Sequence, residues 1–244
     1  MKSTNPAFRT SGFREMPQIG IGETMTLSGA INKTIVLFVL LMITAGWTWT
    51  QYTPLNPAAI QPYMLGGLIV GFILAMATCF KPNWAPVSAP LYAIAEGFAI
   101  GGISAFYNAH AHGIVIQAVA LTFGVMAVML FLYRTGVIKV TEKFRMGLTA
   151  AIGGVFLFYL VTWVVGMFGV NTGLMFGGSG LSIGISLVIV AIAALSLVLD
   201  FDMMQRASVA GAPKYMEWYS GFALMVTLIW LYMEILRLLG NARQ

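Results

Sequence analysis

Residues 34–50 read TIVLFVLLMITAGWTWT, an apolar run that has no charged side chain and ends near Trp47 and Trp49. A helix needs about 20 mostly apolar residues to cross roughly 30 Å of hydrocarbon, and tryptophans gather where such a helix meets the lipid headgroups. This run therefore predicts a membrane-spanning helix.

Six further apolar runs follow along the chain. Backbone groups in lipid must be hydrogen-bonded within the segment, so each run is predicted to be a helix. The expected spans are residues 34–50, 62–80, 85–107, 113–133, 146–168, 180–199 and 218–239. The sequence thus predicts an all-α, polytopic membrane protein with seven transmembrane helices. Residues 1–32 are expected to be a cytoplasmic tail and residues 33–244 the transmembrane domain.

Composition supports the same class. Apolar residue types make up 59% of the 244 residues and charged types 9%, whereas about 25% is usual in a soluble domain. The expected partner of most of the surface is therefore the lipid bilayer. A net charge of +5 without a clustered basic face argues against nucleic-acid binding. The single cysteine, Cys79, excludes a disulfide within the chain.

The lysines and arginines predict the orientation, because cytoplasmic loops carry an excess of them. Eleven of the 13 fall in the tail, at the start of the first helix, or in the loops that follow the second, fourth and sixth helices. The remaining two are Arg237 and Arg243, close to the C-terminus. We expect a multi-pass protein of the inner (plasma) membrane, with the N-terminus cytoplasmic and the C-terminus outside.

Carboxylates inside a bilayer are costly and are candidates for function. Glu96 lies midway along the third expected helix, beside the Gly97–Gly101 pair that permits close helix packing. Tyr92 is one turn earlier on the same face and is expected to hydrogen-bond Glu96. Two interpretations stay open for Glu96: a protonated group that joins helices, or a group that handles ions or protons.

Asp200 and Asp202 stand at the expected end of the sixth helix, and Glu217 opens the seventh. Residues two apart point about 200° apart on a helix, so the two aspartates cannot both face the bundle core. One of them is expected to lie near Glu217 and to form a pH-sensitive group with it. No metal site is certain from the sequence, but these three acids are the candidate ligands for a calcium ion. The alternative is that they are solvated at the membrane edge.

Glu234 and Arg237 are three residues apart on the last helix and are expected to form an ion pair. The two histidines, His110 and His112, are a weak metal signal. We find no Ser/His/Asp set, HExxH pattern or nucleotide-binding motif, so no enzyme activity and no cofactor other than a calcium ion are expected.

Two stretches resemble the Bax inhibitor-1 (transmembrane Bax inhibitor motif) family. Residues 89–104, APLYAIAEGFAIGGIS, resemble its third-helix motif, and residues 197–240, from LVLDFDMMQRA to EILRLLG, resemble the C-terminal part of its bacterial branch. The resemblance implies seven helices, with the last one central between two layers of three. It also implies a pH-sensitive calcium leak, gated by paired acids on the sixth and seventh helices.

The sequence departs from that family at two places. Asp200 or Asp202 matches the sixth-helix acid, but Thr227 stands where the seventh helix carries an aspartate, and residues 62–80 contain no arginine. The first functional hypothesis is a pH-sensitive cation leak, selective for calcium. The second is a non-conducting regulator that binds other membrane proteins or a membrane protease.

Overall fold

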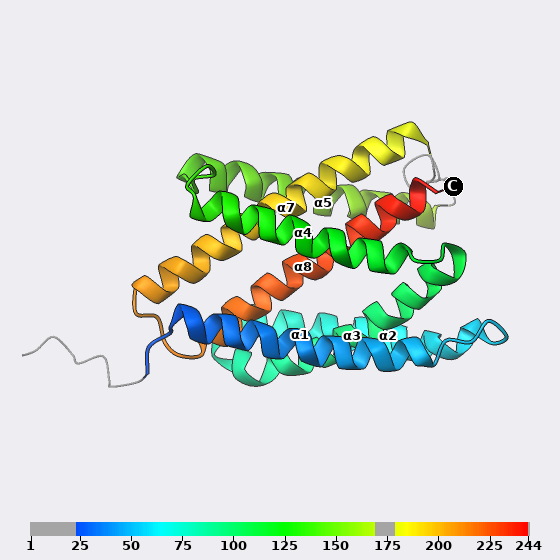
Figure 1. Ribbon diagram of the computed structural model, residues 1–244, viewed down its shortest axis with the longest axis horizontal. Coiled ribbons are helices and arrows are strands. Elements are labelled where there is room, and N and C mark those ends of the chain that lie inside the picture. Colours follow the sequence, from blue (N-terminus) through cyan, green and yellow to red (C-terminus); the bar gives the residue numbers. More distant parts are fainter. Residues whose placement is uncertain (1–22, 169–178, 244) are drawn as a thin grey trace, which may run out of the picture.

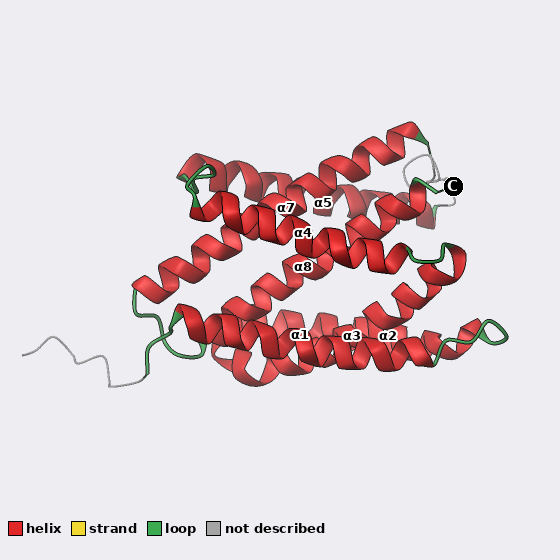
Figure 2. Ribbon diagram, in the orientation of Figure 1, coloured by secondary structure: helices red, strands yellow, loops and turns green. Residues whose placement is uncertain are grey.

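The computed structural model describes residues 23–168 and 179–243, which fold into long helices joined by short connections (Figure 2). The long helices are α1 (Leu27–Thr50), α2 (Gln61–Phe80), α3 (Ala85–His110), α4 (Ile114–Arg134), α5 (Glu142–Met167), α7 (Gly180–Val209) and α8 (Met216–Asn241). Two short 3-10 helices, η3 (Pro57–Ile60) and η4 (Pro82–Trp84), precede α2 and α3. These two described ranges contain no strand, and the predicted all-α class is confirmed.

The helices form two layers with one helix between them. In Figure 1, α1, α2 and α3 lie in one layer and α4, α5 and α7 in the other, while α8 passes between the layers. Helix α8 packs against α1, α3, α4 and α7. The central position that the family resemblance implied for the last helix is therefore confirmed.

All seven long helices of the described ranges are long and apolar enough to cross a membrane. Large apolar side chains such as Phe72, Phe131 and Trp163 point outward and are about two-thirds exposed. Exposing this much apolar surface to water would be unfavourable in free energy, whereas contact with lipid tails is not. The chain is a multi-pass membrane protein surrounded by a bilayer.

One end of the bundle, here called the basic end, holds the start of α1 and the loops after α2, α4 and α7 (Figure 1). The segment before α1 pairs there with the α7–α8 loop, because the Met25 N–H donates to the Ala212 carbonyl at 2.7 Å. The opposite end, the distal end, holds the end of α8.

Glycines bring α3 into direct contact with α1. A Cβ on Gly97 would lie 1.9 Å from Thr44 Oγ1, and a Cβ on Gly101 would lie 2.3 Å from the carbonyl oxygen of Ala45. Only a residue without a side chain allows this approach. The close packing predicted for the small residues beside Glu96 is thus present.

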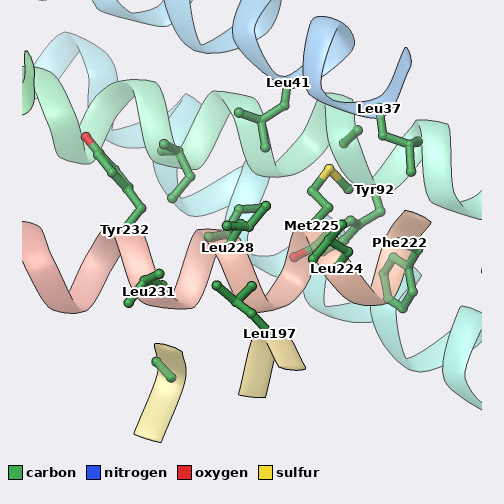
Figure 3. Close-up of a cluster of buried hydrophobic side chains, with 14 of the residues drawn as sticks. Leu37, Leu41, Tyr92, Leu197, Phe222, Leu224, Met225, Leu228, Leu231 and Tyr232 are labelled. Atoms are coloured by element: carbon green, nitrogen blue, oxygen red, sulfur yellow. The ribbon is translucent and has the colours of Figure 1, made fainter. Parts of the chain in front are cut away.

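The hydrophobic core surrounds α8. Figure 3 shows Leu37 and Leu41 of α1 on one side of α8 and Leu197 of α7 on the other, with Met225 and Leu228 of α8 between them. All five side chains are buried. Since apolar residues appear on more than one face of α8, this helix is stable only inside the protein.

Two helix boundaries differ most from those expected. Residues 27–32, predicted as part of the tail, form the first turns of α1, because the Thr26 side chain accepts a hydrogen bond from the Gly29 N–H and caps the helix. Helix α7 continues past Leu199 to Val209, so the two aspartates lie within it rather than at its end. Residues 1–22 of the predicted tail fall outside the described residues.

Candidate functional site

Asp200 lies on the side of α7 that faces α8. The Thr227 hydroxyl interacts with its carboxyl group. The Oδ2 atom of Asp200 is buried and has no hydrogen-bond partner among the described residues. Asp200 is nine residues from the end of α7 at Val209, which places it roughly 14 Å from that end at 1.5 Å per residue. It is therefore a carboxyl group well inside the span of α7 that makes no ion pair with a cation of the described residues.

Asp202 has the opposite environment. Its Oδ2 lies 2.6 Å from Arg206 Nε, one turn further along α7, and accepts a hydrogen bond of 3.1 Å from Arg145 Nη2 on α5. The Asp202 side chain is 11% exposed, while both arginines reach solvent. Two guanidinium groups thus pair with this carboxylate, and the Arg145 contact joins α5 to α7.

Glu217 is almost fully buried, with 1% of its surface exposed, in the first turn of α8. Its Oε1 accepts hydrogen bonds from the backbone N–H and the hydroxyl of Thr26, at 3.0 and 3.1 Å. Gly29 leaves the space for this carboxylate, because a Cβ there would lie 2.0 Å from Oε1. Glu217 therefore fixes the start of α1 to the start of α8.

Lys214, in the loop before α8, lies 3.4 Å from both Glu217 Oε1 and Glu23 Oε2. Desolvation lowers the pKa of Lys214, but the two carboxylates outweigh it and the net pKa is raised. A raised lysine pKa adds stability that is fully present below about pH 10 and is lost only as the pH rises past the shifted value. The contact therefore stays constant around neutral pH.

Asp200, Asp202 and Glu217 do not form the shared site considered from the sequence. The two aspartates point to different helices, as their spacing required, and neither makes a hydrogen bond or ion pair with Glu217 among the described residues. No group of three His, Cys, Asp or Glu residues in the described ranges is placed to hold a metal ion. The sequence pattern predicted one depth for all three acids, because the predicted helix ended at residue 199 and α7 continues to Val209.

Glu96 lies at the α2–α3 interface and is half-buried. Its Oε2 would be 2.6 Å from a Cβ on Gly71, so that glycine makes room for the carboxyl group. The expected hydrogen bond from Tyr92 is not formed among the described residues. The Tyr92 ring packs instead edge-on against Phe222 of α8, with 5.0 Å between ring centroids.

The distal half contains a further buried acid, Glu234. Glu234 pairs with Arg237, as the sequence suggested, and it also accepts hydrogen bonds from the Tyr159 hydroxyl at 2.6 Å and from Trp230 Nε1 at 3.2 Å. The Arg237 guanidinium lies over the Tyr159 ring, 5.1 Å from its centroid. This network joins α5 to α8.

Sequence reasoning did not identify four partners of these acids: Thr26, Arg145, Tyr159 and Trp230. Trp230 precedes Glu234 by one helical turn, and that spacing could have revealed it. Thr26, Arg145 and Tyr159 are distant in sequence from the acids they contact, and only the packing of helices brings them together.

The comparison with known proteins agrees with this architecture. A family model described as Bax inhibitor 1 like matches residues 5–244, which is nearly the whole chain. A comparison of the chain with curated protein sequences found no match. The match includes the seven helices, the central α8 and the stretches around Glu96 and Asp200 that carried the resemblance, and on this basis the chain belongs to the Bax inhibitor 1 like family.

Proposed function

We propose that the protein is a pH-sensitive cation leak of the inner membrane, with calcium as the candidate ion and Asp200 as the controlling carboxyl group. The observation that carries the proposal is the buried Oδ2 of Asp200, which has no partner among the described residues. Charged groups inside membranes are rare, and unpaired ones are associated with ion and proton pathways.

The chemistry at Asp200 would couple proton binding to the contact between α7 and α8. A protonated carboxyl is neutral and fits beside the Thr227 hydroxyl. An ionised carboxylate at the same place needs water or a cation, because a buried charge without a partner is costly. Rising pH would therefore favour separation of α7 from α8 and entry of a cation, and falling pH would favour the closed contact.

The other acids would have supporting roles. Asp202 and Glu217 are already balanced by arginine or lysine, so they would hold helices in place. Glu96 is the second candidate for contact with a moving ion. Calcium takes six to eight oxygen ligands, and Asp200 with Thr227 supplies only a few. A calcium ion there would keep part of its water and would pass through rather than remain bound.

Calcium flux into proteoliposomes of the purified protein, measured from pH 5 to pH 8, tests the proposal. Wild type should conduct more as the pH rises, and Asp200→Asn, which keeps the shape of the side chain, should lose the pH dependence. Glu142→Gln is the matched control, because Glu142 is an exposed acid at the start of α5. Flux by wild type that does not change with pH would refute the role of Asp200.

The second candidate function is a non-conducting regulator that binds a membrane protein or membrane protease. The outward face of α5 favours it, because Cβ atoms added at Gly147, Gly153, Gly154 or Gly166 would meet nothing within 4 Å. Glycines on a lipid-facing surface permit a partner helix to approach. Absence of flux at every pH, together with crosslinks from cysteines placed on this face to another membrane protein in cells, would favour this function. Neither function requires a catalytic step.

A further inference from the structure

A groove of about 1310 Å³ opens between α1 and α4 at the basic end. The first two-thirds of α1 form one wall, the second half of α4 forms the other, and α7 and α8 form the floor. Outward-facing residues such as Ile35, Val39 and Leu130 line its walls. The groove faces the bilayer along its side, so lipid can enter it without passing through the bundle.

An aromatic pair narrows the groove at mid-membrane. The rings of Phe38 on α1 and Phe123 on α4 are 6.1 Å apart, and both residues also line a smaller cavity on the distal side. From Phe123 to Arg134 the helix rises roughly 16 Å, which is about half of the 30 Å hydrocarbon thickness. The groove is thus as deep as one leaflet.

The chemistry of the groove changes along its length. Its deep part is lined by aliphatic and aromatic side chains, and its mouth at the basic end is lined by Arg134, Lys139, Tyr133, Gln205 and Ser208. The groove is therefore apolar in its deep part and polar and cationic at its mouth. A phospholipid matches this arrangement, because its acyl chains are apolar and its phosphate is anionic.

The two cations at the mouth are not neutralised by any acid among the described residues. Arg134 and Lys139 make no ion pair among the described residues, and the described acids of the basic end pair with other cations. Glu23 and Glu217 contact Lys214, Glu142 contacts Arg145, and Asp202 contacts Arg145 and Arg206. Arg206 also donates to the Val140 carbonyl at 3.3 Å and so holds the loop that carries Lys139.

We propose that this groove binds one anionic phospholipid from the leaflet at the basic end, with an acyl chain between α1 and α4 and its phosphate at Arg134 and Lys139. Uncompensated positive charge at the headgroup level selects an anionic lipid over a zwitterionic one, while the apolar walls accept either chain. The bound lipid would fill the space where α1 and α4 do not touch and would couple the two layers of helices.

The test uses the purified full chain in nanodiscs made of equal parts phosphatidylglycerol and phosphatidylcholine. In one preparation the phosphatidylglycerol carries a photoreactive group on its acyl chain, and in a second preparation the phosphatidylcholine carries it. Native mass spectrometry counts the lipids retained, and peptide mapping locates the crosslinks. Wild type should retain phosphatidylglycerol in preference, with crosslinks on α1 and α4. The double variant Arg134→Gln with Lys139→Gln should lower that preference roughly thirtyfold, since each basic residue near the surface contributes about 1 kcal/mol.

Two matched controls keep the test specific. Lys81→Gln with Lys143→Gln removes the same charge from the basic end outside the groove and should leave the preference unchanged. Leu130→Trp fills the groove and should remove the α1 and α4 crosslinks, whereas Leu121→Trp, on the same helix but outside the groove, should not. Equal retention of both lipids by wild type, an unaffected Arg134/Lys139 variant, or crosslinks that map elsewhere would each overturn the proposal.

Discussion

The two layers of helices are held together in different ways. In the α1–α3 layer, backbones touch: Gly101 lies against Ala45, and a Cβ on Gly67 of α2 would be 2.5 Å from the Ala95 carbonyl oxygen. In the α4–α5–α7 layer, the contacts to α5 include long polar side chains, with Arg145 reaching Asp202 near the basic end. Added Cβ atoms on four α5 glycines would meet nothing within 4 Å.

This difference indicates which half of the molecule can move. Helices in backbone contact cannot shift by an ångström without a steric clash, whereas helices joined by flexible ionic side chains can shift while those contacts persist. Asp200, on α7, lies where the second layer meets α8. We therefore expect any change in conformation to occur in the second layer, against a fixed α1–α3 layer.

The largest effect should come from an added methyl group in the first layer. Gly101→Ala places a Cβ 2.3 Å from the Ala45 carbonyl oxygen, and the neighbouring Ala45 backbone cannot move aside cheaply. We expect a loss of about 3 kcal/mol in the free energy of unfolding, at the upper end of the usual cost of overpacking. Thermal unfolding in detergent measures it.

Gly154→Ala on α5 is the matched control, because it adds the same group to a helix interior where nothing lies within 4 Å. It should not destabilise the protein, and it should raise the free energy of unfolding by up to about 1 kcal/mol, because alanine favours a helix more than glycine does. Equal effects of the two substitutions would mean that the layers are packed alike, and the comparison would fail.

Asp202→Asn should have an intermediate effect. It removes the carboxylate that joins Arg145 of α5 to Arg206 of α7. Breaking a fully buried ion pair costs about 3–5 kcal/mol, but these arginines are 42% and 54% exposed and can turn to water. We therefore expect a loss of roughly 2 kcal/mol and a wider distribution of α5–α3 distances between spin labels.

Glu142→Gln is the control for that measurement, because Glu142 is 80% exposed and 3.9 Å from Arg145. It should change neither stability nor the distance distribution. If Asp202→Asn leaves the spin-label distances unchanged, α5 is held by its apolar contacts with α7 and not by the ion bridge.

Only one side of this difference between the layers could be predicted from the sequence. Gly97 and Gly101 are spaced four residues apart on an apolar helix, which predicts close contact wherever the partner lies. The ionic bridges could not be predicted in the same way. Arg145 and Asp202 are separated by more than fifty residues, and the sequence gives no rule for which helices become neighbours.

The depth of Asp200 was misjudged for a related reason. A hydropathy pattern ends a span at its first charge, and it therefore ended α7 at Leu199. The fold extends the helix to Val209 because Arg206 neutralises Asp202 from one turn away. A short-range ion pair can thus continue a helix beyond its apolar part, and this one places Asp200 inside the protein opposite Thr227.

The smallest effect should come from Tyr159→Phe, at the distal contact of α5. The substitution removes only the hydroxyl that donates to Glu234 Oε1 at 2.6 Å, and the ring under the Arg237 guanidinium remains. Glu234 keeps its bonds to Arg237 and Trp230, so it is not left without partners. A single hydrogen bond of this kind contributes about 1 kcal/mol or slightly more. Tyr63→Phe on α2 is the control, because its hydroxyl makes no hydrogen bond among the described residues, and it should leave thermal stability unchanged.

If α5 is held by polar contacts at both ends, Tyr159→Phe combined with Asp202→Asn should free α5 more than the sum of the single variants. The measurement is the accessibility of cysteines placed on α5 to a thiol reagent. Simple additivity would mean that the two contacts act independently and that α5 does not move as a unit.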